Sequence, residues 1–393
     1  MPGYPHLAPR VGTLRPSPFA AFADRIARAQ RDPEFVPLHL GDTYPLPPEA
    51  ARRVVIDEPS LHRYGPVGGD LELREAGAAD LRQLGLSWAE TATTFVTPGA
   101  TGGLDVACAT LFAPGDEVIV LTPSWPLIFG ILTRHGATLV QTPVSESGAL
   151  PEPSALAARV EAALTDKSAG LYLCNPNNPV GFTYSAEHLA ALCELVVSRG
   201  LWFVCDSVYT DLLPDLSIKP LAALPESLAE RTSVVTSYSK SLGLAGHRVG
   251  LLSAAPAVAA KAAAMQTFTT YHPSRIGQAM ALASLQRDAA ESRAGRSALV
   301  KEGIELTLQH LRGVVPLVAE PEGGAFVFLD LRERAADGDA LLQLLLDCMD
   351  QGVSLAPGEA FGDDFARFAR LCYTAVPPER LRVGLERLAQ LLG

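Results

Sequence analysis

The sequence predicts an α/β protein in which a mostly parallel sheet has helices on both faces and a smaller α+β domain follows. From residue 48 to about residue 285, short apolar stretches typical of strands alternate with Ala- and Leu-rich stretches of helical period. The length of 393 residues also exceeds the usual size of a single hydrophobic core. These two observations predict a large domain and a small one.

The elements follow in chain order. Residues 1–47 are Pro-rich with one helical stretch at 19–31, and we expect them to form an N-terminal arm that joins the small domain. Residues 48–286 are predicted to form the large domain and residues 287–393 the C-terminal small domain. The patterns predict strands at 94–96, 117–121, 170–173, 201–205, 232–236 and 324–331, and helices at 104–112, 153–163, 185–198, 254–264, 274–311, 339–352 and 378–392.

Composition narrows the classes of function. The net charge of -11 and the pI near 5.3 argue against nonspecific binding of nucleic acid. The six cysteines show no metal-ligand spacing, so we expect buried thiols and no metal site. The first residues do not resemble a leader and no apolar stretch reaches membrane-spanning length, so a cytoplasmic location is expected.

Lys240 is the most informative residue of the chain. Among the five lysines it alone directly follows a predicted buried strand, at the sheet edge where open α/β folds bind ligands. A desolvated lysine at that edge can lose its proton and attack a carbonyl carbon, forming a Schiff base. An ordinary solvated lysine is the alternative.

Two further polar residues end predicted strands. Asp206 follows the apolar run 201–205, and Asn178 lies in the Asn-Pro turn after 170–173. Asp206 has an ordinary interpretation as a cap of the next segment. Beside Lys240, however, it has the chemistry of a carboxylate that pairs with a protonated pyridine nitrogen.

These motifs, in this order, resemble those of the class I/II aminotransferases, fold-type-I enzymes that use pyridoxal 5′-phosphate (PLP). The resemblance extends over nearly the whole chain. The matching residues are segments 40–42, 64–69, 71–74, 97–101, 123–126 and 357–362, together with Asn178, Asp206, Tyr209, Ser237, Lys240, Arg248 and Arg370.

The resemblance implies how the cofactor is held. Lys240 would form the Schiff base and act as the general base, Asp206 would pair with the pyridine nitrogen, and Trp125 would stack on the ring. Asn178 and Tyr209 would hydrogen-bond the phenolic oxygen of the ring. The phosphate would be bound by a helix N-terminus and its neighbours, namely Gly99, Ala100, Thr101, Ser237 and Arg248.

The resemblance also implies a substrate site and a homodimer. Gly41, Asn178 and Arg370 would bind the α-carboxylate, for which the planar arginine fork is suited. Tyr64 would reach the cofactor across a dimer interface, as would the segment 271–275. In that segment the family has smaller residues where this chain has His272 and Arg275.

The implied activity is transfer of an amino group between an L-amino acid and a 2-oxo acid. Dicarboxylate-specific relatives place an arginine near the position of Thr267, so we expect neutral or aromatic amino acids to be preferred over aspartate. Tyr44, Trp125 and Tyr271 would line the side-chain pocket, while inward-pointing His272 and Arg275 would instead admit a polar or anionic group. A PLP-dependent lyase, cyclase or decarboxylase on the same fold is the alternative. A PLP-binding regulator is disfavoured because the Pro-rich start does not resemble a DNA-binding module.

Overall fold

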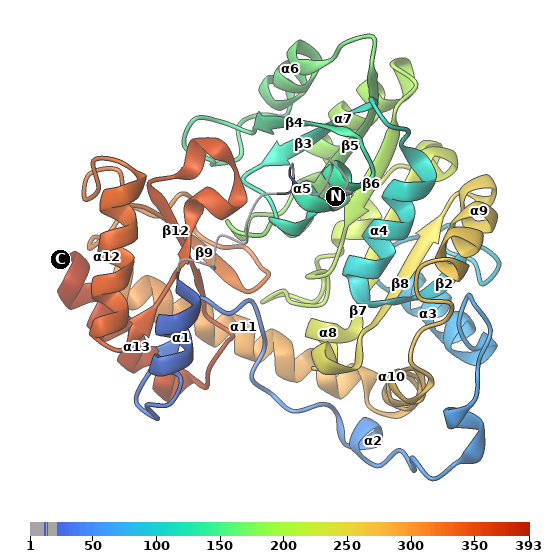
Figure 1. The fold of residues 1–393 in the computed structure, drawn as a ribbon, viewed down its shortest axis with the longest axis horizontal. Coiled ribbons are helices and arrows are strands. Elements are labelled where there is room, and N and C mark those ends of the chain that lie inside the picture. Colours follow the sequence, from blue (N-terminus) through green and yellow to red (C-terminus); the bar gives the residue numbers. More distant parts are fainter. Residues whose placement is uncertain (1–11, 13, 15–21) are drawn as a thin grey trace, which may run out of the picture.

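The computed structural model describes residues 12, 14 and 22–393 (Figure 1). The predicted helix at 19–31 therefore lies partly outside the described residues, and its described part is α1 (Ala23–Ala29). Among the described residues, no helix is both long enough and apolar enough to cross a membrane.

A seven-stranded sheet forms the centre of the larger part, in the order β2-β8-β7-β6-β5-β3-β4. β8 is antiparallel to both of its neighbours, and the remaining pairs are parallel. The mostly parallel α/β fold is thus confirmed. The strands are β2 (Thr94–Pro98), β3 (Glu117–Thr122), β4 (Thr138–Pro143), β5 (Ser168–Cys174), β6 (Trp202–Asp206), β7 (Thr232–Ser237) and β8 (Val249–Ala254).

Both faces of this sheet are covered by hydrophobic cores. Each strand contributes to both cores, because alternate residues of a strand point to opposite faces. Ile119 and Leu171 belong to one hydrophobic core, whereas Val118 and Tyr172 belong to another. The helices around the sheet are α2 (Glu49–Arg52), α3 (Leu71–Gln83), α4 (Gly99–Leu111), α5 (Leu127–Arg134), α6 (Pro153–Ala163), α7 (Ala186–Ser198), α8 (Tyr238–Ser241), α9 (Pro256–Thr267) and α10 (Arg275–Arg287) (Figure 1).

A third hydrophobic core surrounds a small antiparallel sheet of order β11-β12-β9. The N-terminal segment joins this part, because β1 (Val36–Pro37) pairs in parallel with β10 (Val353–Ser354). The predicted domain boundaries at residues 48 and 287 stay a prediction. The remaining elements are α11 (Ala289–Leu311), β9 (Phe326–Asp330), α12 (Gly338–Asp350), β11 (Ala356–Pro357), β12 (Phe368–Cys372) and α13 (Pro378–Leu392).

The predicted continuous helix at 274–311 is wrong in one respect, because it is divided between α10 and α11. Asp288 between them has a non-helical backbone, and its carboxylate accepts a hydrogen bond of 2.6 Å from the Ala50 N–H. The stretch 286–298 contains no large apolar side chain, so the apolar periodicity did not locate the break. The contact with Ala50 joins residues that are distant in sequence.

Candidate active site

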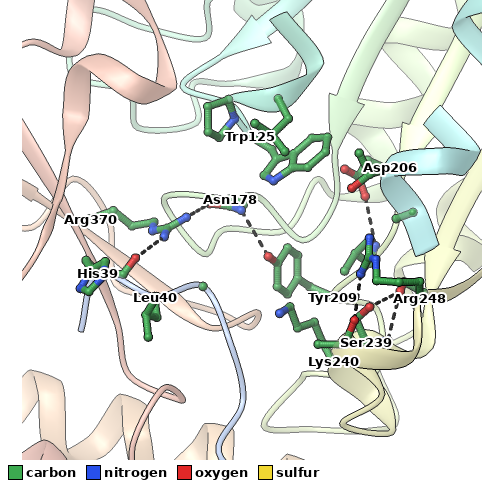
Figure 2. Close-up of a pocket in the computed structure, with 18 of the residues that line it drawn as sticks. His39, Leu40, Trp125, Asn178, Asp206, Tyr209, Ser239, Lys240, Arg248 and Arg370 are labelled. Atoms are coloured by element: carbon green, nitrogen blue, oxygen red, sulfur yellow. Dashed lines mark hydrogen bonds between the residues drawn. The ribbon is translucent and has the colours of Figure 1, made fainter. Parts of the chain in front are cut away.

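The carboxyl ends of β5, β6 and β7 meet at one edge of the sheet, beside a cavity of about 470 Å³ (Figure 2). Most of the predicted site residues line it. These are Gly41, Ala100, Thr101, Trp125, Asn178, Asp206, Tyr209, Ser237, Lys240, Arg248 and Arg370. Leu40 and Pro126, from the matching segments 40–42 and 123–126, also line it. The sequence did not indicate the remaining lining residues, which are Ile26, His39, Leu127, Val208, Ser239 and Ala245.

Lys240 lies in α8, the single helical turn that follows β7. The Ser237 hydroxyl caps this turn by accepting a hydrogen bond of 3.0 Å from the Ser239 N–H. The Lys240 Nζ donates to Asp42 Oδ1 at 3.0 Å. The Lys240 side chain is 13% exposed and that of Asp42 is 51% exposed, so water screens this ion pair. Asp42 was not among the predicted site residues, and its position next to Gly41 is the one sequence signal that pointed to it.

Asp206 is a buried carboxylate at the end of β6. It accepts hydrogen bonds from Tyr172 Oη at 3.0 Å and from the Val208 N–H at 3.3 Å. Burial outweighs both bonds and raises the pKa of Asp206 to about 6. Within residues 22–393 it forms no ion pair with a lysine or arginine. A cationic N–H donor placed in the cavity would therefore stabilise its charged form.

A chain of hydrogen bonds joins Tyr209, Asn178 and Arg370 (Figure 2). Asn178 Nδ2 donates to Tyr209 Oη at 3.2 Å, and Asn178 Oδ1 accepts from Arg370 Nη1 at 3.0 Å. Arg370 Nη2 donates to the His39 carbonyl at 2.9 Å.

The Arg370 guanidinium lies 4.2 Å from the centre of the Phe326 ring and 4.8 Å from that of Phe361. Its Nε is buried without a hydrogen-bond partner, and burial lowers the pKa of Arg370. A buried arginine held in this way has an unused donor and an uncompensated charge, so it can bind a carboxylate.

The N-terminus of α4 forms the opposite end of the cavity. Gly99 has a φ of 68°, and a Cβ there would lie 2.6 Å from Arg248 Nη2. Gly99 does not line the cavity itself, but its missing side chain lets Arg248 approach the helix. Ser237 Oγ donates to the Val249 carbonyl at 3.1 Å. The free N–H groups, the hydroxyl and the guanidinium together suit a phosphate.

Trp125 follows β3, and Figure 2 shows its indole on the far side of the cavity from Lys240. A flat aromatic face in that position can cover a planar ring. Of the three aromatic residues predicted for the side-chain pocket, Trp125 lines the cavity of this chain, whereas Tyr44 and Tyr271 do not.

Tyr64 and the segment 271–275 lie outside this cavity. Tyr64 is 84% exposed, and its ring packs on Tyr271 and His272 with centroid separations of 5.4 and 5.7 Å. Arg275 donates from Nε to Asp70 at 3.3 Å and from Nη1 to the Ser60 carbonyl at 2.5 Å. These two acceptors hold Arg275 outside the cavity of its own chain, and the expectation that it points into a substrate pocket stays a prediction.

Comparison with known proteins identifies the class of enzyme. The family described as aminotransferase class I and II matches residues 35–388. The chain belongs to this family. It is 31% identical to the aspartate/prephenate aminotransferase of Thermus thermophilus, over 98% of this chain and 99% of the relative. It is also 31% identical to the arginine–pyruvate transaminase of Pseudomonas aeruginosa, over 94% of this chain and 93% of the relative.

Solved structures agree with these matches. The aspartate aminotransferase of Thermus thermophilus with maleate superposes with a TM-score of 0.85 at 29% identity, over 99% of this chain and 100% of that one. A mutant of the same enzyme complexed with tryptophan gives a TM-score of 0.84 at 29% identity, again over 99% and 100% of the two chains. The protein is a PLP-dependent aminotransferase that moves an amino group between an amino acid and a 2-oxo acid.

The residues of the cavity fit PLP in three respects. The buried Asp206 carboxylate matches a protonated pyridine nitrogen, and the helix N-terminus near Arg248 matches the phosphate. Lys240 is an amine at the same cavity. Each charged or reactive group of PLP would therefore meet a residue of suitable chemistry: the ring nitrogen a carboxylate, the phosphate a cation and helix N–H groups, and the aldehyde an amine.

Proposed function

We propose that this cavity is the active site of the aminotransferase and that each residue holds a separate part of PLP or of the substrate. Asp206 holds the ring nitrogen, Asn178 and Tyr209 hold the phenolic oxygen, and Trp125 packs on the ring. Ala100, Thr101, Ser237 and Arg248 hold the phosphate, with Gly99 leaving space for Arg248. When bound, PLP supplies an electron sink for the electron pair left at the substrate Cα.

Lys240 is proposed as the residue that bonds the cofactor and moves the proton at the substrate Cα. Its Nζ can reach the cavity and also Asp42, which is half exposed. In the neutral form the amine accepts the Cα proton. Asp42 can then hold the ammonium that results, as it does at 3.0 Å in this structure.

Lys240→Ala is expected to abolish turnover, with Lys261→Ala as the matched control because Lys261 lies on the exposed face of α9. Borohydride reduction of the PLP-loaded protein should attach the cofactor to Lys240. Wild-type turnover in Lys240→Ala, or labelling of another lysine, would contradict the assignment.

Arg370 is proposed to bind the substrate α-carboxylate. The observation that carries this role is the buried Nε without a partner, beside Gly41 and the Asn178 side chain. The carboxylate would neutralise a guanidinium that burial leaves uncompensated. Gly41 contributes space, because a Cβ there would lie 3.4 Å from Arg370 Nη2.

We propose that neutral or aromatic amino acids are preferred over aspartate. The apolar side chains of Ile26, Leu40, Leu127 and Trp125 line the cavity. Its lysine and arginines are assigned to the cofactor and the α-carboxylate, and burial and Arg370 lower the pKa of His39 to about 4, so His39 is neutral at pH 7. No cation that lines the cavity within the described part of this chain is left for a second carboxylate.

A single-turnover screen tests the substrate preference. The protein loaded with PLP is mixed with each common amino acid, and conversion of the cofactor to its amine form is followed by absorbance. Neutral or aromatic amino acids should convert it faster than aspartate, and the fastest reaction with aspartate would overturn the preference. Release of ammonia without the amine form would favour the lyase alternative.

We also propose that the protein is a homodimer with shared active sites, in which Tyr64 reaches the cavity of the partner. The support is a set of large apolar side chains, in segment 46–64 and at residue 268, that are far more exposed than core residues are. Its members are Leu46 (72% exposed), Val55 (69%), Ile56 (55%), Tyr64 (84%) and Phe268 (88%).

A further inference from the structure

A buried charge cluster lies next to the cavity but does not line it. Arg293 of α11 donates from Nε to Asp211 Oδ1 at 3.0 Å, and its Nη2 contacts the Asp80 carboxylate of α3. The three side chains are 16%, 8% and 7% exposed in the order Arg293, Asp211 and Asp80. One guanidinium therefore holds two buried carboxylates that come from separate elements.

Two of these groups are close in sequence to proposed catalytic residues. Asp211 is two residues after Tyr209, in the turn that the Leu212 N–H closes on the Tyr209 carbonyl at 2.8 Å. Tyr238 is two residues before Lys240, and its buried hydroxyl faces Asp80. Burial, followed by the charges of Asp80 and Asp211, raises its pKa well above the ordinary value.

α11 contacts the site at two further points beside Arg293. Ser292 Oγ donates to the Ser241 carbonyl of α8 at 3.2 Å. One turn later, Arg296 Nη1 donates to Thr43 Oγ1 at 3.2 Å, next to Asp42. The same stretch of α11 thus contacts three parts of the site. Ser292 contacts α8, Arg293 contacts the turn 209–212 (the Tyr209 turn), and Arg296 contacts the segment that holds Gly41.

We propose that Arg293 is a positioning residue that fixes the Tyr209 turn and α8 relative to each other, and so fixes Tyr209 and Lys240 at the cofactor. This inference rests on the proposed function. Without the guanidinium, Asp80 and Asp211 repel each other inside the protein. The Tyr209 turn and α3 then lose their common anchor, and Asp80 of α3 is the carboxylate that faces Tyr238 at the start of α8. The hydrogen bond between Asn178 and Tyr209 then has no fixed geometry, although Arg370 keeps its own contacts.

The test uses Arg293→Met and Arg293→Lys in the full-length, PLP-loaded protein. The pH midpoint of the cofactor absorbance should shift by about one unit or more in Arg293→Met, because Tyr209 no longer holds its place. The rate constant of the half-reaction should fall about 10²-fold while the KM for the amino acid changes little. Arg293→Lys should restore part of the midpoint and part of the rate constant, because lysine returns the positive charge without the planar geometry by which the guanidinium holds two carboxylates.

An uncharged triple variant of this cluster, Asp80→Asn with Arg293→Met and Asp211→Asn, separates positioning from stability. It removes the unpaired carboxylates, so its unfolding temperature should return close to that of the parent while the absorbance midpoint stays shifted. Arg199→Met is the matched control, because Arg199 forms an exposed ion pair with Glu161 at 2.8 Å.

Three outcomes would overturn a claim, the first the proposed function and the other two the positioning role. A parent protein that converts no amino acid contradicts the proposed function. The positioning role is contradicted if the parent reacts and Arg293→Met and the triple variant both have the parent's pH midpoint of cofactor absorbance and its half-reaction rate constant. A triple variant that regains stability, midpoint and rate together would also overturn it, since Arg293 would then merely balance charge.

Discussion

At the scale of single residues, Asp206 shows how a binding site can be costly to the free protein. Its pKa is raised from the ordinary value to about 6, so the folded cofactor-free protein binds this proton more tightly than the unfolded chain does. The stability contributed by this group is therefore present below about pH 4 and is lost as the pH rises to 6. Ionisation at pH 7 costs roughly 3 kcal/mol, which a bound pyridinium would offset.

Asp206→Asn should consequently make the cofactor-free protein at least as stable as the parent at pH 7, while weakening PLP binding. Turnover should fall about a thousandfold or more, because an amide cannot stabilise the protonated ring as a carboxylate does. Urea unfolding of the cofactor-free protein and turnover at saturating PLP measure the two effects. Near-normal turnover in loaded Asp206→Asn would refute the pairing.

At the scale of elements, the close approach of α4 and Arg248 depends on Gly99. Gly99→Ala would place a methyl group 2.6 Å from Arg248 Nη2 at a φ of 68°. We expect PLP affinity to fall by about tenfold or more, because Arg248 must move away from the phosphate. Gly130→Ala in α5 is the control, since nothing lies within 4 Å of its added Cβ. Equal affinities for the two variants would contradict this arrangement of the phosphate site.

The strands that carry the site were predictable because each polar residue ends an apolar run or follows it within four residues. Asp206, Asn178 and Lys240 needed no long-range information beyond the rule that parallel strands end at the same edge. His39 and Asp42 could not be found in this way. His39 shares a hydrogen bond of 2.6 Å with Ser354, and Asp42 meets Lys240, so both depend on segments distant in sequence.

At the scale of the whole molecule, the dependence of stability on pH contains opposing contributions. Burial and the charge of Arg370 lower the pKa of His39 from 6.5 to about 4, so the unfolded chain binds this proton more tightly. The contribution of His39 to stability is therefore present above about pH 6.5 and is lost as the pH falls to 4. Its sign is opposite to that of Asp206 and Asp80, whose pKa values are both raised to about 6.

On lowering the pH from 7 to 4, the free energy of unfolding of the parent should thus fall by roughly 3 kcal/mol more than that of His39→Gln, because only the parent must protonate a buried imidazole. The difference between the two unfolding free energies isolates His39 from the aspartates, which both proteins share. Urea unfolding of the cofactor-free proteins at several pH values measures it, with the exposed His62→Gln as control. A difference that does not vary with pH would contradict the assignment of a buried, neutral His39.

The cytoplasmic location stays a prediction from the sequence.

The proposed dimer can be tested through its shared sites. Lys240→Ala and Tyr64→Ala chains are each expected to have reduced activity when pure. If Tyr64 serves the partner's cavity, a hybrid dimer contains one cavity with both native residues and one cavity with neither. Random exchange of equal amounts then leaves about a quarter of all cavities native.

Mixing and re-associating the two variants should therefore give about a quarter of the wild-type activity beyond what the unmixed variants retain. If Tyr64 acted on its own chain, every cavity would lack one of the two residues, and mixing would restore nothing. A mixture of Lys240→Ala with Asp206→Ala is the control, because both residues line the same cavity of one chain and no native cavity can form. Sedimentation of the wild-type protein as a monomer at the assay concentration would rule out the shared site independently of activity.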